Sequence, residues 1–162
     1  LDLMIHDIDA ILSVVKSNVA NVQANGVSVI SQTPDIANAR LQFENGCVAN
    51  LTASRISLKT MRKSRFFQQD AYVSVDYFKK KVEIVRMQDA PKSPEDFAMI
   101  LKNAEGIEKQ ILFDNPEVHE SNAILSELES FADAIRKNKE PVVSLRAGTS
   151  ALEVAYQIIN CF

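Results

Sequence analysis

An aspartate and a histidine stand four residues apart at the start of the sequence, in the segment LDLMIHDID. In a helix, Asp2 and His6 would be neighbours on one face, with Cβ atoms about 5–6 Å apart. A carboxylate beside an imidazole can orient the ring and raise its basicity, and histidine titrates near neutral pH. The pair is therefore suited to proton transfer with a substrate hydroxyl.

The same residues also have a structural interpretation. A histidine near a helix start often packs against its neighbours or caps the helix, and aspartates there complement the positive end of the helix dipole. Asp2, Asp7 and Asp9 would all serve that purpose. Residue types alone leave both interpretations open.

The helix that would carry the pair is predicted over residues 2–17. At 100° per residue its polar side chains fall in one narrow stripe: Asp2, His6, Asp9, Ser13 and Lys16. Nearly all its other residues are apolar, whereas a surface helix is usually half polar. We therefore expect a buried helix whose single polar seam faces solvent, a partner group or a ligand.

Five cationic side chains lie between residues 55 and 65: Arg55, Lys59, Arg62, Lys63 and Arg65. One interpretation is a solvated strand edge, where charges prevent aggregation. The other is a cationic lip for phosphate, since arginine binds anions through paired hydrogen bonds. On the second interpretation Arg55, Arg62 and Lys63 are the candidate substrate contacts.

Composition narrows the class of protein. A chain of 162 residues suits one domain, and a net charge of -3 gives no reason to expect nucleic acid or a membrane surface as partner. No apolar run reaches membrane-spanning length. Cys47 and Cys161 are too few for a disulfide framework or a zinc site, which favours a reducing, cytoplasmic location and no bound metal. The four glycines are never closely spaced, so this chain cannot build a dinucleotide-binding loop.

Residues 35–54 predict a β-hairpin whose register can be argued. Apolar residues alternate with polar ones in DIANARLQF and CVANLTAS, which ENG joins. A two-residue loop would set Leu41 opposite Asn50. A three-residue loop with Gly46 in the left-handed conformation keeps the apolar faces together, with Leu41 opposite Ala49, so we choose it.

The remaining elements complete an α+β order. Further strands are predicted at 19–30, 62–69, 71–77, 81–87, 97–103 and 107–113, forming a meander of antiparallel hairpins, with a polar loop at 88–96. Helical period returns in the last fifty residues, at Ile124, Leu128, Phe131 and Ile135 and then from about 146 to 160. Helices are expected to pack on one face of an antiparallel sheet.

Three segments resemble the C-terminal domain of the Gfo/Idh/MocA oxidoreductases. LDLMIHDIDAIL resembles the start of that domain, whose signature Asp2, His6 and Asp9 match. FENGCVANLTASR resembles its central hairpin, and LESFADAIRKNKEPVVSLRAGTSALEVAYQI its closing helices. One departure is Ala147 before Gly148, where many members have aspartate as a helix cap.

The resemblance implies a large open, mainly antiparallel sheet with helices on one face, as in the C-terminal domain of glyceraldehyde-3-phosphate dehydrogenase. The free sheet face often builds a homo-oligomer. Family members carry an N-terminal Rossmann domain that binds NAD or NADP and contributes a catalytic lysine. This chain shows neither, so residues 1–162 are interpreted as a single substrate-binding and oligomerisation domain, inactive in isolation.

The resemblance also implies roles for individual residues. His6 would be the acid/base for a sugar or polyol hydroxyl, Asp2 would help to place the substrate, and Asp9 would be structural. Residues 54–67, with AYVSVD after them, resemble the branch that acts on nucleotide-activated amino sugars such as UDP-N-acetylglucosamine, with oxidation expected at C3.

Two rival interpretations remain open at this point. The chain could be a self-contained α+β module for dimerisation or ligand binding, without a redox role. It could also keep the family fold but lack catalysis.

Overall fold

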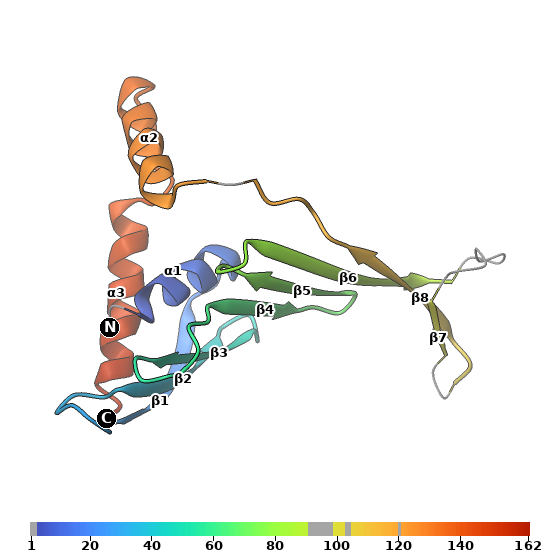
Figure 1. Ribbon diagram of the computed structural model, residues 1–162, viewed down its shortest axis with the longest axis horizontal. Helices are drawn as coiled ribbons and strands as arrows, with labels where there is room; N and C mark the ends of the chain where they lie inside the picture. Colours follow the sequence, from blue (N-terminus) through green and yellow to red (C-terminus); the bar gives the residue numbers. More distant parts are fainter. Residues whose placement is uncertain (1–2, 91–98, 103–104, 120) are drawn as a thin grey trace. The chain divides into compact units, whose positions relative to one another are not determined.

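The computed structural model describes residues 3–90, 99–102, 105–119 and 121–162. Over these residues it has three helices and eight strands, which confirms the expected α+β class (Figure 1). The chain divides into two compact units, one formed by residues 1–58 with 123–162 and the other by residues 59–122. Among the described residues, the antiparallel pairing and the type of each predicted helix and strand are confirmed.

The first unit is built on a three-stranded antiparallel sheet in the order β1-β2-β3. These strands are β1 (Val19–Val27), β2 (Ile36–Phe43) and β3 (Val48–Ser54). Alternation places Ala39, Leu41 and Phe43 in the core, while the polar side chains between them face outward. The apolar face of the sheet is therefore the face on which helices can pack.

The β2–β3 hairpin has the register expected from the sequence. Leu41 pairs with Ala49 and Ala39 with Leu51. The Phe43 N–H donates to the Cys47 carbonyl at 2.9 Å, and Gly46 has φ +84°, in the left-handed region. Glycine adopts this region without the steric cost that a Cβ atom brings, so the three-residue loop is confirmed.

Two helices, α1 (Ile5–Val14) and α3 (Leu145–Ile159), pack together and against the three-stranded sheet (Figure 1). The core includes Met4 and Ile8 at the start of α1 and Ala151, Val154, Ala155 and Ile158 from α3. Helix α1 is shorter than the helix predicted over residues 2–17. It is also not buried on every apolar side, because Leu3 and Val14 are more than half exposed.

The second unit is a five-stranded antiparallel sheet in the order β4-β5-β6-β8-β7. Its strands are β4 (Lys63–Phe67), β5 (Ala71–Asp76), β6 (Lys81–Asp89), β7 (Met99–Lys102) and β8 (Glu108–Asp114). The strands thus divide between two sheets, where the sequence predicted one. The order also departs from a simple meander, because β8 lies between β6 and β7. Strand β6 continues to Asp89, into the predicted loop, and residues 91–96 of that loop lie outside the described residues.

The helix α2 (Ala123–Arg136) forms where the periodicity predicted it. Its apolar stripe was expected to pack on the sheet. In the described structure that stripe is exposed, with exposed fractions between 55% and 71% for Ile124, Leu128, Phe131 and Ile135. Periodicity correctly predicted the helix but not its burial.

Candidate active-site surface

His6 lies in the first turn of α1, and its side chain is exposed. The helix that carries His6 is packed through Met4 and Ile8, while the imidazole itself is open to a ligand. Asp2, the predicted partner, lies outside the described residues. The structure therefore places one member of the pair.

The polar seam of α1 continues from His6 into a groove. Asp9 and Ser13 line a hollow of about 480 Å³ whose opposite wall comes from α3. The α3 wall carries Arg146, Ser150, Glu153 and Gln157. The seam residues Asp9 and Ser13 are therefore open to this groove, whereas His6 is exposed but is not among the residues that line it.

The sequence analysis did not predict that α3 would contribute polar residues to this groove. The signal was present, because Arg146, Ser150, Glu153 and Gln157 follow the same four-three-four spacing as the seam of α1. Such spacing places polar side chains on one helix face. Two polar seams that face each other make a hydrophilic groove between otherwise apolar helices.

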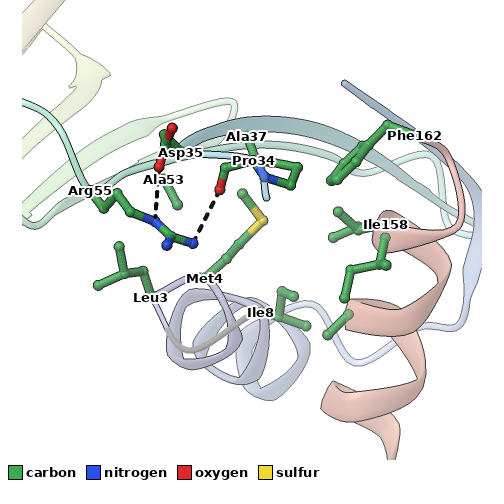
Figure 2. Close-up of a pocket in the computed structure, with 12 residues that line it drawn as sticks. Leu3, Met4, Ile8, Pro34, Asp35, Ala37, Ala53, Arg55, Ile158 and Phe162 are labelled. Atoms are coloured by element: carbon green, nitrogen blue, oxygen red, sulfur yellow. Dashed lines mark hydrogen bonds and ion pairs between the residues drawn. The ribbon is translucent and has the colours of Figure 1, made fainter. Parts of the chain in front are cut away.

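Arg55 follows β3 and lines a separate pocket of about 400 Å³ on the Met4 side of α1 (Figure 2). Its Nε atom lies 3.6 Å from Oδ1 of Asp35, and its Nη2 donates to the Pro34 carbonyl at 3.2 Å. The side chain is 51% exposed. The walls of the pocket are mainly apolar: Leu3, Met4, Ile8, Pro34, Ala37, Ala53, Ala155, Ile158, Ile159 and Phe162.

Asp35, which the sequence analysis did not single out, is a buried carboxylate. Its Oδ2 accepts from the backbone N–H groups of Val29, Ile30 and Ser31, at 2.8, 2.8 and 3.1 Å. The N–H groups of Ile30 and Val29 are the main reason that the pKa of Asp35 lies well below its usual range. The sequence contained a sign of this role, because Asp35 directly follows the turn-forming residues SQTP. Aspartate side chains in turns often accept hydrogen bonds from nearby backbone N–H groups.

Arg62 and Lys63, the other two predicted substrate contacts, belong to the second unit. The Arg62 guanidinium lies 5.0 Å from the centroid of the Tyr77 ring, a cation–π arrangement. Lys63 Nζ lies 2.9 Å from Oδ2 of Asp76. The Lys79 N–H first, and then Lys63, hold the pKa of Asp76 below its usual value. Each predicted cation thus has a partner within its own unit.

The strands of the described residues do not form the arrangement that binds a nicotinamide dinucleotide. All strand pairs among the described residues are antiparallel, whereas the dinucleotide site needs a parallel strand–turn–helix with clustered glycines. In the same part of the chain, no group of three His, Cys, Asp or Glu side chains is arranged to hold a metal ion. None of the described helices is long and apolar enough to span a membrane.

Comparison with known proteins finds a family match in the first part of the chain and a similar enzyme over nearly all of it. Residues 1–72 match the GFO/IDH/MocA C-terminal domain. The chain is 30% identical over 158 residues to the UDP-N-acetylglucosamine 3-dehydrogenase of Acidithiobacillus ferrooxidans, covering 98% of this chain and 46% of that protein. A solved structure of that enzyme superposes with a TM-score of 0.82 at 28% identity, over 99% of this chain and 46% of that chain.

A more distant relative shows the same fold. Levoglucosan dehydrogenase, in complex with NADH, superposes with a TM-score of 0.70 at 15% identity, over 99% of this chain and 46% of that one. The chain is thus similar to the GFO/IDH/MocA C-terminal domain over residues 1–72, and to the sugar-nucleotide dehydrogenase over nearly its full length. It spans less than half the length of the relatives that it matches.

Proposed function

We propose that this chain is the substrate-binding and oligomerisation domain of an NAD(P)-dependent oxidoreductase acting on a sugar, sugar nucleotide or polyol hydroxyl. The observation that carries the proposal is the match to a sugar-nucleotide dehydrogenase over 98% of the chain. All 162 residues would act as one domain of a larger, cytoplasmic enzyme, whose partners include neither nucleic acid nor membrane.

In this reaction the chain would supply the group that accepts the proton of the substrate hydroxyl. Oxidation of a secondary alcohol to a ketone removes a hydride and a proton, which need separate acceptors. His6 would take the hydroxyl proton, because its imidazole is exposed on the first turn of a helix anchored by Ile8. Asp2, one turn earlier in the sequence, would orient the ring and place the substrate.

The cofactor would be NAD or NADP, bound mainly outside this chain. The described residues do not fit a dinucleotide, whereas levoglucosan dehydrogenase, which shares the fold, binds NADH. The isolated chain should therefore lack dehydrogenase activity. The alternative is that the chain is a stand-alone binding module without a redox role.

We propose a UDP-activated amino sugar as the substrate, oxidised at C3. The relative that supports this choice is the UDP-N-acetylglucosamine 3-dehydrogenase. Arg55 in the first unit, and Arg62 and Lys63 in the second, are the candidate contacts to an anionic group of the substrate. A guanidinium has five N–H donors, so the two internal partners of Arg55 do not prevent it from binding an anion.

A homo-oligomer would form through a sheet face. In the five-stranded sheet, Phe67, Met87, Met99 and Phe113 share one face through the strand register. Their exposed fractions run from 43% to 76%. An apolar surface of this kind is typical of a contact with another protein surface.

The test is steady-state reduction of NAD or NADP by the full-length protein with UDP-N-acetylglucosamine. His6→Ala should lower kcat/KM by about 100-fold or more, because general acid–base catalysis contributes that much. His119→Ala is the matched control, since it removes the other histidine, also exposed. Unchanged turnover in His6→Ala, or no nicotinamide reduction with any sugar or sugar nucleotide, would reject the proposal.

A further inference from the structure

The carboxylate of Asp35 is stabilised mainly by its own loop. Besides the three backbone N–H groups, the Ser31 hydroxyl donates to Oδ1 at 2.8 Å. The Asp35 N–H donates to the Val27 carbonyl, and its carbonyl accepts from the Arg55 N–H at 3.0 Å. Since the loop donors already share the negative charge, Asp35 does not need Arg55 as its counter-ion.

The guanidinium of Arg55, in contrast, is held in place by only some of its N–H groups. Its Nε faces Asp35, and its Nη2 bonds to Pro34, so two sides of the planar guanidinium are held. Among the described residues, none hydrogen-bonds to its Nη1 group. Arg55 lines the pocket together with Leu3 and Met4, and Figure 2 draws these side chains on the same side of it. A half-exposed guanidinium in a fixed orientation is well suited to an anion.

The pocket beside Arg55 is suited to an uncharged, flat group. Its volume of about 400 Å³ lies within the range of small-molecule sites. Met4, Ile158 and Phe162 supply apolar walls, and the cation stands at one side. A ligand that combines a flat ring with a nearby anionic group matches this arrangement. A nucleoside diphosphate is such a ligand.

We propose that this pocket is the subsite for the nucleoside diphosphate of the substrate, with Arg55 as a phosphate contact and Asp35 as its positioning residue. The choice of ligand rests on the proposed function. Asp35 acts through Arg55: it fixes the guanidinium plane so that the remaining N–H groups face the ligand. Preorganisation of this kind lowers the entropy lost on binding.

The experiment measures UDP binding to the full-length protein by calorimetry, without nicotinamide or turnover. Arg55→Ala should weaken UDP binding about tenfold or more, the usual effect of losing a hydrogen bond to a charged group. Asp35→Asn should weaken it in the parent protein but not in the Arg55→Ala background. In turnover, both variants should raise KM for the sugar nucleotide and leave kcat within about threefold.

Three further variants keep the test decisive. Arg40→Ala removes an exposed arginine on the outer face of the same sheet and should leave UDP affinity unchanged. Arg55→Lys keeps the charge and the Asp35 loop, so it should bind UDP with intermediate affinity even if Asp35→Asn fails to fold. Ala53→Leu adds volume at the pocket wall and should weaken UDP binding.

Other results overturn the inference. If Asp35→Asn weakens UDP binding equally with and without Arg55, Asp35 is structural. If Ala53→Leu raises thermal stability and leaves UDP affinity unchanged, the pocket is a packing defect or the seat of another protein segment. UDP binding without nicotinamide reduction would reject the proposed function and leave this subsite standing, so the two failures are distinguishable.

Discussion

The ring of Phe162 occupies the space where a side chain at position 26 would lie. A Cβ atom on Gly26 would be 2.7 Å from Cδ2 and Cε2 of Phe162 and 2.9 Å from Cγ of Pro34. Gly26 belongs to β1, so its lack of a side chain lets the last residue of the sequence lie against the strand. Because Phe162 also lines the Arg55 pocket, the contact helps to shape that pocket.

Gly26→Ala should therefore destabilise the fold by about 1 kcal/mol, the lower end of the cost of overpacking, because Phe162 is 45% exposed and can move partly aside. Real Cβ atoms do not approach ring carbons this closely, so Phe162 or the strand must move. The measurement is the free energy of unfolding in urea. Phe162→Ala should recover part of the loss in the double variant, because it removes the closer of the two clashes.

Gly148→Ala is the matched control for that substitution. Gly148 lies in α3, and a Cβ atom there would meet nothing within 4 Å. Alanine is the better helix former, so this variant should gain about 0.5–1 kcal/mol. Equal effects of the two substitutions would show that the Phe162 contact does not restrict position 26.

Gly46→Ala should destabilise the β2–β3 hairpin for a different reason. A Cβ atom at position 46 would meet nothing within 4 Å, but the residue has φ +84°. A left-handed conformation costs about 1–2 kcal/mol for residues with a Cβ atom. Gly46→Asn should cost less, because asparagine tolerates this region better. If urea unfolding shows equal losses for both variants, the backbone conformation is not the cause.

The hairpin shows what could be predicted from sequence. Its register follows from local information alone: alternation fixes which residues must share a face, and a glycine at the right place fixes the loop. Leu41 pairs with Ala49 for that reason. The seam of α1 was predictable in the same way, since residue spacing on a helix determines its faces.

Partners distant in sequence were not predictable. Alternation cannot tell whether β3 and β4 share a sheet, and they do not. Charge clustering near Arg55 indicated an anion site, but it could not show that Asp35, twenty positions earlier, holds the guanidinium. Such relationships depend on which backbone segments the fold brings together, which no local pattern encodes.

The stability of the five-stranded unit should depend on Asp76 at acid pH. Its pKa is lowered from 3.8 in the folded protein, by the Lys79 N–H first and then by Lys63. A lowered pKa means that the folded state favours the ionised carboxylate. Its stabilisation is therefore complete above about pH 5, where the carboxylate is ionised in the unfolded chain too, and is lost as the pH falls further.

Asp76→Asn should consequently flatten the fall in unfolding free energy between about pH 5 and pH 2. The measurement is urea unfolding across that range, followed by a probe in the second unit. Asp70→Asn is the control, because Asp70 is an exposed carboxylate in the same unit. An acid slope that persists in Asp76→Asn would mean that other carboxylates dominate it.

Two leucines in the first unit should respond very differently to the same substitution. Leu41 is fully buried under α1 and α3, whereas Leu128 on α2 is 61% exposed. Leu41→Ala should cost about 3–5 kcal/mol, as cavity formation in a packed core does. Leu128→Ala should stay within about 0.5 kcal/mol, as exposed positions usually do.

The comparison also tests whether the α2 stripe is exposed in solution. A short helix gains most of its stability from packing of its apolar face. If Leu128→Ala in the full-length protein costs as much as Leu41→Ala, that face is covered by another part of the protein or by a second copy. Concentration-dependent unfolding would indicate the second copy, because only an intermolecular contact weakens on dilution.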